Sequence, residues 1–399
     1  MRLAFLIGSG VSRAAGLKDT AELTQVILRP SNNVFNPFEP TETVSAFMQL
    51  LAEEQSRLLK RLGNRRPVNY EDICYLAAQI ADSEVGEFEN AAVETFVDKL
   101  AHELVNQEER FKEPDDPEWG QEGYWRERVY RLAVSSVRTI KQTVASELSQ
   151  EAPRPDALRV LADAARRGEV GLDVFTLNHD TLLETLWNLE GISFEDGFRP
   201  VADVRSNCYL AAYPEVTVWS AQAYDTKCST RPSLLKLHGS IDWWSLWHPD
   251  VDFLPPAKVK GDPLHILARP EHRARSKYLP PAELEPVILV GTFNKMLHQA
   301  RGDSFLDLLC LFRRRLASTD RLVISGYGFG DKGINGIIIE WLTSPNHRAL
   351  LIDPAPEDTL DRGRGAVQSL VRAKARGQLT MWTGGFEDFE FPAVLTWAK

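Results

Sequence analysis

Three short apolar runs in this chain each lead into a residue that can do chemistry, and this pattern constrains the fold most. The runs Leu3–Ile7, Leu172–Thr176 and Leu234–Leu237 have the length and character of buried strands. A glycine turn follows the first run, Asn178 follows the second and His238 follows the third. Ligands of open α/β sheets bind outside the carboxyl ends of the strands. The sequence therefore predicts a ligand site at which these three segments meet.

Strands and helices alternate from about Pro155 onward. Further strands are predicted at Val287–Val290, Arg321–Ser325 and Ala349–Asp353, and helices at Pro155–Arg167, Thr181–Leu189, Ser304–Ala317 and Gly333–Leu342. Strands that are apolar almost throughout and alternate with helices are typical of a parallel sheet covered on both faces. We therefore expect an α/β fold with a doubly wound, Rossmann-like parallel sheet. The irregular stretches 195–231 and 251–286 are expected to form loops or short hairpins over the strand ends.

A long stretch with little strand character separates the first predicted strand from the second. Apolar residues recur there at helical spacing in Glu42–Leu62, Tyr70–Ala81, Ala91–Leu104 and Trp125–Leu148. The segment Lys112–Gly123 is rich in Pro, Asp, Glu and Gly, which predicts an exposed loop. We therefore expect a large helical insertion after the first strand. Residues 21–150 would form this helical subdomain, and residues 1–20 and 151–399 would form the sheet domain.

The charge balance and the cysteine pattern disfavour several classes of protein. The formal net charge of −10 argues against direct nucleic-acid binding. The longest apolar runs are far shorter than the roughly 18 residues that a membrane span needs, and no signal peptide precedes the first strand, so we expect a cytoplasmic protein without membrane contact. None of the four cysteines lies in a C-x-x-C pair, so no structural zinc site is expected, and we expect no metal.

Two glycine turns and one acidic residue at strand ends are candidates for nucleotide binding. The first turn contains Gly8, Ser9, Gly10 and Ser12, and the second contains Gly326, Tyr327 and Gly328. Glycines at such positions let backbone N–H groups approach a pyrophosphate, although a tight turn by itself also favours glycine. Asp353 ends a strand where an acidic side chain commonly binds ribose hydroxyls. The alternative for Asp353 is a turn residue before Pro354.

Polar residues after the second and third runs are the candidates for catalysis. Asn178, two residues after Thr176, offers both a donor and an acceptor, which suits a carboxamide or an attacking water. Asp180 could accept from a hydroxyl group or offset a positive charge, and it could also cap the following helix. His238 is followed by Gly239, which lets a ligand come close, so a neutral imidazole there could take up a proton. The alternative for His238 is a structural, buried histidine.

Together these motifs resemble the sirtuin-like superfamily. Its glycine turn, its T-Q-N-x-D motif, its catalytic L-H-G and its late G-x-S turn are similar to segments that follow in the same order in this chain. These segments are Gly8–Ser12, Thr176–Asp180, Leu237–Gly239 and Gly326–Gly328. The resemblance implies that residues 1–20 and 151–399 form an NAD-binding domain. It also implies that His238, Asn178 and Asp180 are catalytic, and that the two glycine turns, Thr176 and Asp353 bind NAD.

Departures from the family pattern narrow the activity that the resemblance implies. Deacylases of the family carry two C-x-x-C pairs for a zinc ribbon, and here Leu177 and Gly328 replace their glutamine and serine. The large helical insertion, together with Tyr70–Ile73 and with Lys295 after Val287–Val290, is similar to a bacterial antiviral-defence group that lacks the ribbon. That group implies hydrolysis of NAD, as substrate, to nicotinamide and ADP-ribose. We also expect a homo-oligomer and an activating partner protein, for which the resemblance suggests a HerA-type ATPase or a short Argonaute.

Two other functions stay open at this point. NAD-dependent protein deacylation would yield O-acetyl-ADP-ribose from an acetyl-lysine peptide, whereas hydrolysis yields plain ADP-ribose. A non-catalytic sensor subunit would bind NAD or ADP-ribose without turnover and signal through the helical subdomain.

Overall fold

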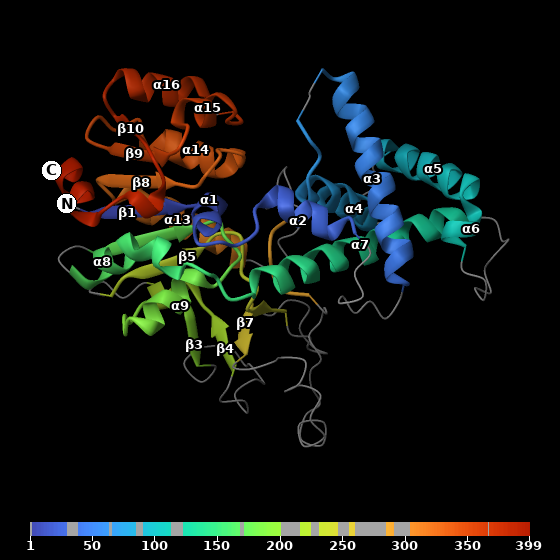
Figure 1. Cartoon of the computed structure of the whole chain (residues 1–399), viewed down its shortest axis with the longest axis horizontal. Helices are drawn as coiled ribbons and strands as arrows, with labels where there is room; N and C mark the ends of the chain where they lie inside the picture. The colour runs from blue at the N-terminus through green and yellow to red at the C-terminus, as the bar shows by residue number, and fades with distance from the viewer. Residues whose placement is uncertain are drawn as a thin grey trace. The chain divides into compact units, whose positions relative to one another are not determined.

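Six parallel strands form the central sheet of the protein, shown in a computed structural model in Figure 1. The structure describes residues 2–29, 39–63, 66–84, 91–112, 123–167, 171–200, 216–224, 231–245, 255–259, 285–290, 304–365 and 367–399. In chain order the strands are β1 (Leu3–Ile7), β2 (Leu172–Thr176), β5 (Ser233–Lys236), β8 (Arg321–Ser325), β9 (Arg348–Asp353) and β10 (Leu379–Thr383).

The strand order confirms the predicted doubly wound sheet. Across the sheet it is β10-β9-β8-β1-β2-β5. The chain therefore winds outward from β1 through β2 and β5, returns to β8 on the other side of β1, and winds outward again through β9 and β10. This is the order of a Rossmann fold, and its direction reverses between β1 and β8. The crevice at the carboxyl ends of these two strands is the expected place for a ligand.

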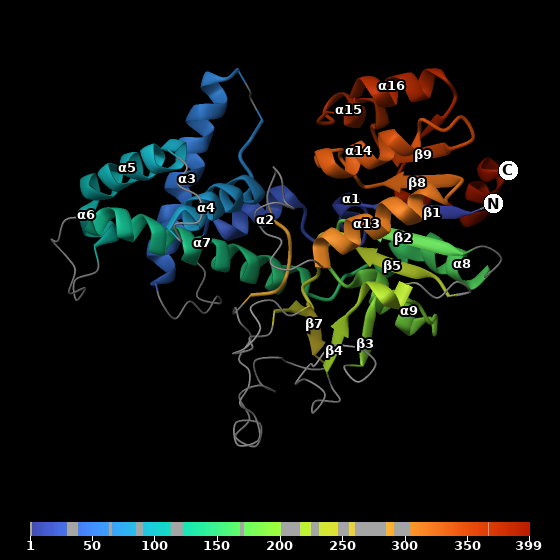
Figure 2. The same ribbon diagram turned by 180° about the vertical axis from the view of Figure 1, so that it is seen from behind.

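Alternate residues of the strands pack against helices on opposite faces of the sheet. In β1, Leu6 belongs to one apolar core together with residues of α13 (Ser304–Ala317) and α14 (Lys332–Trp341), and Figure 2 shows α13 in front of the sheet. Phe5 belongs to a second core, with α8 (Arg159–Arg167) and α9 (Leu182–Leu189). Each fully buried Leu or Phe side chain stabilises the fold by roughly 1.5–3 kcal/mol. This double burial explains why β1 is apolar throughout.

The structure corrects one predicted strand and adds another. Val287–Val290 is not a strand of the parallel sheet, because Ile288 makes only an isolated antiparallel bridge to Gly239. The segment is apolar because it is buried beside the loop after β5, where Leu289 N–H donates to the His238 carbonyl at 2.8 Å. β10, which the sequence pattern did not predict, is an edge strand whose residues Thr380–Thr383 are partly or fully exposed.

A small antiparallel sheet takes three of its four strands from the stretches that were predicted to be irregular, and its fourth strand, β6, lies between them. Its strands are β3 (Phe198–Pro200), β4 (Val216–Trp219), β7 (Ala257–Val259) and β6 (Trp243–Trp244), in that order across the sheet. The indole of Trp243 is buried in the first core, beside Phe198. Short hairpin-like strands over the end of the main sheet are consistent with the sequence expectation.

The predicted helical insertion after β1 is present. Its helices are α2 (Thr20–Ile27), α3 (Thr41–Arg61), α4 (Tyr70–Glu84), α5 (Ala91–Asn106), α6 (Glu108–Phe111) and α7 (Tyr124–Leu148). The chain divides into two compact units, one of residues 1–19, 147–289 and 299–399, and one of residues 20–146 and 290–298. Inside the helical unit, the buried guanidinium of Arg128 pairs with Glu39 and donates to the Phe111 carbonyl at 3.0 Å. This contact joins α7 to the segment before α3 and to the last residue of α6.

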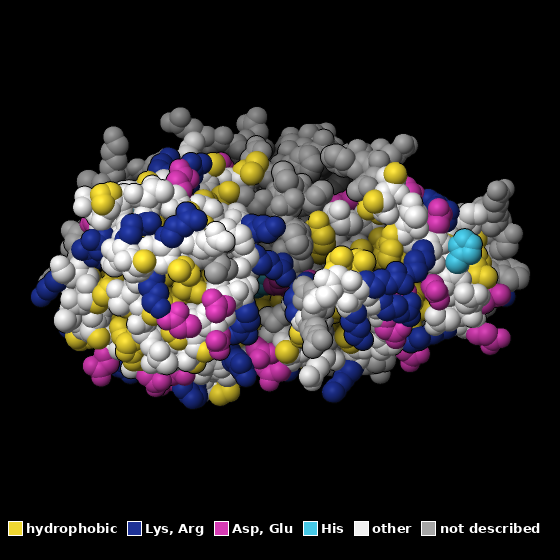
Figure 3. Space-filling model, turned by 90° about the horizontal axis from the view of Figure 1, so that it is seen from above, with side chains coloured by type: hydrophobic (Ala, Val, Ile, Leu, Met, Phe, Trp, Pro, Cys, Tyr) yellow, Lys and Arg dark blue, Asp and Glu magenta, His cyan; other side chains and the backbone are white. Residues whose placement is uncertain are grey.

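The surfaces of both units carry local positive patches despite the negative net charge. Figure 3 shows Lys and Arg side chains gathered on each unit, and α3 ends in Lys60 and Arg61. The net charge therefore does not describe every face of the molecule. Among the residues that the structure describes, no helix is long and apolar enough to cross a membrane.

Candidate functional site

Four strand ends are level with one another at the carboxyl edge of the sheet. Ile7 pairs with Thr176 on one side and with Ser325 on the other, and Thr176 pairs with Lys236. The segments that follow these residues therefore leave the sheet at one edge. They are the predicted site segments Gly8–Ser12, Asn178–Asp180, His238 and Gly326–Gly328.

The two glycine turns pack directly against each other at the reversal of the strand order. Gly8 N–H donates to the Ser325 carbonyl and Gly10 N–H to the Gly326 carbonyl, both at 3.0 Å. A Cβ on Gly8 would lie 2.4 Å from the Gly326 oxygen. Gly326 itself has φ of +64°, and a Cβ there would lie 2.5 Å from the Val11 nitrogen. Glycine is therefore needed at both positions for backbone packing, whatever ligand the turns bind.

This packing predicts a large stability difference between two substitutions in the second turn. Gly326→Ala should lower the free energy of unfolding by at least about 1–3 kcal/mol, because it adds a positive-φ penalty to the contact with Val11. Gly330→Ala, where a Cβ meets nothing within 4 Å, is the matched control and should change it little. Urea unfolding of the two variants measures the difference. Equal stabilities would contradict the packing described here.

Ser9, Gly10 and Gly328 are the solvent-exposed members of the two turns. Gly328 has open space where a side chain would lie. The buried member Tyr327 turns its hydroxyl toward the start of α14, where it donates to Asn335 Oδ1 at 2.8 Å. Burial raises the pKa of the Tyr327 phenol well above its usual value, so the hydroxyl stays a donor. Tyr327 thus shapes the turn with its side chain and offers a ligand only its backbone.

A chain of hydrogen bonds fixes the side chain of Asn178. Ser12 Oγ donates to Asp180 Oδ2 at 2.6 Å, because a carboxylate can only accept. Ser12 Oγ in turn accepts from Asn178 Nδ2 at 2.8 Å, and the Gly8 carbonyl accepts from the same nitrogen at 3.0 Å. Both hydrogens of the amide nitrogen are therefore used.

The amide oxygen of Asn178 is left as a buried acceptor at the sheet edge. Among the described residues Oδ1 has no hydrogen-bond partner, although Asn178 is only 7% exposed. An unsatisfied buried acceptor costs about 1–3 kcal/mol and calls for an explanation. A ligand N–H group or a water at this atom would supply one.

Asp180 has two roles at once. Its Oδ2 accepts from Ser12, and its Oδ1 accepts from Leu182 N–H at 3.1 Å at the start of α9. Thr181 is the N-cap residue of α9, and Asp180, one residue earlier, bonds the N–H of the first helical residue while also taking part in the site. Thr176, at the end of β2, also holds the loop, because its Oγ1 accepts from Asn178 N–H at 3.0 Å. The preceding strand and the following helix thus both hold the loop that carries Asn178.

His238 reaches from the end of β5 to the loop that follows β8. Its Nε2 lies 3.1 Å from Asp331 Oδ2, and the imidazole is largely buried. Because β1 and β2 lie between β5 and β8, this contact passes over the ends of both strands. The ring centroid of His179, which is also buried, lies 6.4 Å from that of His238. The histidine is therefore turned toward the crevice between β1 and β8.

Asp353 is placed as the turn residue that the alternative interpretation described. Its Oδ1 accepts from Ala355 N–H at 2.7 Å and from Thr359 Oγ1 at 3.1 Å. It ends β9, next to β8, and its side chain is partly exposed. These contacts order the turn into α15 (Pro356–Asp361) and do not bring Asp353 into contact with the residues around Asn178.

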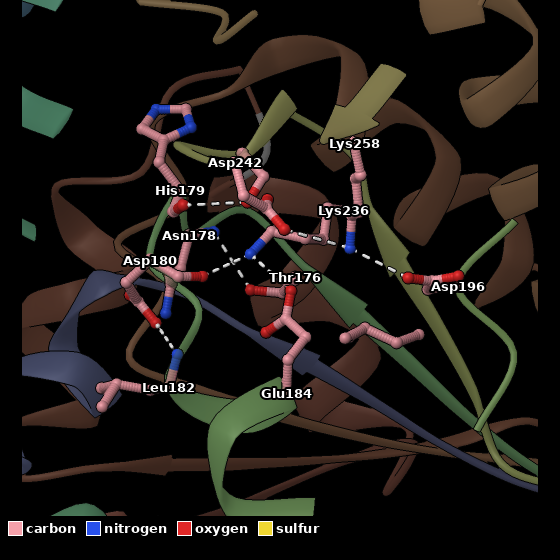
Figure 4. Close-up of polar contacts among 12 residues, drawn as sticks. Thr176, Asn178, His179, Asp180, Leu182, Glu184, Asp196, Lys236, Asp242 and Lys258 are labelled. Carbon is pink, nitrogen blue, oxygen red and sulfur yellow. Dashed lines mark hydrogen bonds and ion pairs between the residues drawn. The ribbon is translucent and has the colours of Figure 1, made fainter. Parts of the chain in front are cut away.

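A group of charges beneath the Asn178 loop, of which Lys236 and Glu184 are buried, was not predicted as part of the site. Figure 4 shows Lys236 between the loop and α9. Its ammonium group donates to the Asp180 carbonyl and lies 3.0 Å from Glu184 Oε1. Nearby, Lys258 Nζ lies 2.9 Å from Asp196 Oδ2 and 3.2 Å from Asp242 Oδ2. A lysine within an otherwise apolar strand is the sequence signal that could have found this group.

Opposing effects set the charge states in this group. Burial raises the pKa of Glu184 above its usual value, and the neighbouring Lys236 opposes that rise. For Lys258, burial acts to lower the pKa, but Asp242 and Asp196 outweigh it and the pKa is raised, so the amine stays charged. Asp242 is the reverse case: burial acts to raise its pKa, and the lysines lower it. Lys236 therefore holds the Asn178 loop from below, and Lys258 pairs with the carboxylates of Asp196 and Asp242 beside it.

Comparison with known proteins agrees with the superfamily that the sequence predicts. The SIR2-like domain family matches residues 173–374, just over half of the chain. The protein therefore belongs to this family. Among solved structures, the crystal structure of a Sir2 homolog–NAD complex is similar, with 11% identity and a TM-score of 0.39 over 100% of this chain and 91% of the other. No curated protein matches the chain.

The described residues were also compared with the expectation that the protein binds no metal. In the part of the chain that the structure describes, no three His, Cys, Asp or Glu side chains are grouped to hold a metal ion. Of the cysteines in this part, Cys74 is buried and Cys310 is exposed, each as a free thiol.

Proposed function

We propose that this protein is an NAD glycohydrolase. In the reaction, the bond between the ribose C1′ and the pyridinium nitrogen breaks, and its electron pair goes to nicotinamide. A water oxygen then bonds to C1′ and gives up a proton, which leaves ADP-ribose. The positive ring already primes the leaving group, so the protein mainly has to position the substrate and accept the proton.

The observation that carries the proposal is the buried, unpartnered Oδ1 of Asn178. It lies at the carboxyl edge of the sheet, in the loop that follows β2, the strand next to β1. Its orientation is fixed by Gly8 and Ser12, so it is an acceptor in any bound state that keeps this network. Both the carboxamide N–H of nicotinamide and an attacking water are donors that would satisfy it.

The other site residues have complementary roles in this proposal. His238 would bind a ribose hydroxyl and take up the proton, and Asp180 would hold Ser12 and Asn178 in place. The exposed backbone of the two glycine turns would hold the pyrophosphate, together with Ser9 and Ser12. Thr176 would support the Asn178 loop. Asp353, at the end of β9, would face the far ribose. The two pyrophosphate-binding turns belong to the domain proposed to span residues 1–20 and 151–399.

A direct assay tests the proposal. Purified protein incubated with NAD should release nicotinamide and ADP-ribose, and His238→Ala should lower the rate about 100- to 10,000-fold, because proton transfer is lost. His102→Ala removes an exposed histidine of α5 and should leave the rate unchanged. Equal turnover in the wild type and His238→Ala would refute the assignment.

The same assay separates the alternatives. An added acetyl-lysine peptide yields O-acetyl-ADP-ribose only if the protein is a deacylase. Tight NAD binding without turnover under every activating condition identifies a sensor subunit. We favour hydrolysis because the sequence has no C-x-x-C pair for the ribbon that borders the acyl-lysine groove in deacylases.

Unrestrained NAD cleavage would kill the cell that makes the enzyme, so we propose that its activity is gated. The setting would be bacterial defence against phages, in the cytoplasm, with a homo-oligomer formed through the helical subdomain of residues 21–150. A separate activating protein, of the HerA-type ATPase or short Argonaute kind, would supply the trigger. Copurification from the native host, followed by the NAD assay with and without the copurified protein, tests this regulation. The chain alone should show only a basal rate, and an equal rate with and without the copurified protein would contradict the gating.

A further inference from the structure

The carboxylate of Asp331 makes two kinds of contact at the same time. Its Oδ1 accepts from Gly333 N–H at 2.8 Å and from Ile334 N–H at 3.1 Å, which caps α14. Its Oδ2 lies 3.1 Å from Nε2 of His238. Because the cap fixes the plane of the carboxylate, the second oxygen is held toward the imidazole.

The backbone around Asp331 is also held firmly. The Tyr327 hydroxyl accepts from Asp331 N–H at 3.3 Å and donates to Asn335 Oδ1 at 2.8 Å. Asn335 Nδ2 donates to the carbonyls of Phe329, at 2.8 Å, and Arg364, at 2.9 Å. Asn335 and Tyr327 are buried. This network makes Asp331 a rigid partner for His238 and not a mobile surface charge.

The pairing determines where neutral His238 carries its proton. A carboxylate has no hydrogen to donate, so Nε2 must be the N–H that faces it, and the lone pair is on Nδ1. We propose that Asp331 is a positioning residue that sets this tautomer and makes Nδ1 the base. The inference rests on the proposed NAD hydrolysis. In that reaction a ribose hydroxyl or water gives its proton to Nδ1 and keeps the electron pair, while Nε2–H stays on the carboxylate.

Asp331→Asn tests the proposal because the helix cap dictates how the amide must lie. The cap needs an acceptor, so the amide oxygen takes the place of Oδ1 and the NH₂ group faces Nε2. Neutral His238 then has to carry its proton on Nδ1. We expect kcat to fall by between about 10-fold and 10,000-fold, the upper end being the loss when a catalytic histidine is forced into the wrong tautomer in the Ser-His-Asp triad. KM should change far less.

Asp331→Ser is the second variant. A serine hydroxyl is a good helix cap, so α14 keeps its start, but the hydroxyl is too short to hold the imidazole. His238 then samples both tautomers, and kcat should lie between those of the wild type and Asp331→Asn. Asp358→Asn, which removes an exposed carboxylate of α15, is the matched control and should behave as the wild type.

Nitrogen chemical shifts of the His238 imidazole, measured by NMR without NAD and assigned with His238→Gln, report the tautomer independently of catalysis. We expect Nε2–H in the wild type and Nδ1–H in Asp331→Asn. Nδ1–H in the wild type, or wild-type kcat in Asp331→Asn with the tautomer changed, would overturn the proposal. If the wild type shows the expected tautomer but releases no nicotinamide with or without the copurified protein, the proposed function fails and the Asp331–His238 pairing stands. Should Asp331→Asn not fold, Asp331→Ser gives the same two readouts.

Discussion

Replacing Asn178 by Ala should lower kcat/KM for NAD about 100- to 10,000-fold. The amide holds the Gly8 and Ser12 segments together and presents Oδ1 as an acceptor, so its loss removes both the contact with the substrate or water and the order of the network. A misplacement of about 1 Å can by itself cost roughly 100-fold. Nicotinamide release, followed over a range of NAD concentrations, measures the effect.

A matched control separates this effect from a general loss of structure. Asn188→Ala removes an exposed asparagine of α9, in the same unit of the chain, and should leave kcat/KM unchanged. Circular dichroism should show that both variants are folded. If Asn178→Ala is folded and turns over NAD at the wild-type rate, Oδ1 has no part in the reaction, and the main support for the proposed function is lost.

Replacing Lys236 by Met should lower the free energy of unfolding by about 3–5 kcal/mol, because it leaves the carboxylate of Glu184 buried without its partner. Lys236 is 2% exposed and lies 3.0 Å from Glu184. The effect should depend on pH. Without Lys236 the raised pKa of Glu184 rises further, so the folded state binds a proton more tightly than the unfolded chain. The loss of stability should therefore shrink as the pH falls from about 8 to about 5.

The double variant Lys236→Met/Glu184→Leu shows whether the pair or the apolar packing matters. Replacement of a buried ion pair by apolar side chains is often close to neutral, so the double variant should recover most of the stability that the single variant loses. Urea unfolding at several pH values gives all the required free energies. A single variant as stable as the wild type, or a loss that grows as the pH falls, would show that Lys236 and Glu184 do not form the pair described here.

Apolar strands and glycine turns explain how much of the fold could be predicted from the sequence. β1, β2 and β8 are buried on both faces, so their sequences are unmistakably strand-like. β10 was missed because it lies at the edge and exposes most of its residues. Val287–Val290 was misassigned because burial beside a loop and burial in a sheet select the same apolar residues. The pattern of apolar residues in a sequence indicates which segments are buried, but it does not indicate which strand, if any, they pair with.

The sequence points to a site residue when a polar side chain that can do chemistry directly follows a predicted strand. Asn178 and His238 satisfy this condition directly. Asp331 does not, because its partner lies 93 residues earlier in the chain and the pairing exists only once β5 and β8 are in one sheet. Lys236 was overlooked as a site element because it lies inside the predicted apolar run Leu234–Leu237. Interactions between distant segments are therefore the part that the sequence alone did not reveal.

The close backbone contact between the Gly8 and Gly326 turns has a consequence for affinity. Neither turn can shift without breaking the hydrogen bonds that join it to the other turn. The two turns therefore behave as one rigid unit, here called the seam. A ligand that lies across this seam meets a surface that is already organised. Little of its binding free energy is then spent on restricting loop motion, and tight binding needs fewer contacts than it would on two independent loops.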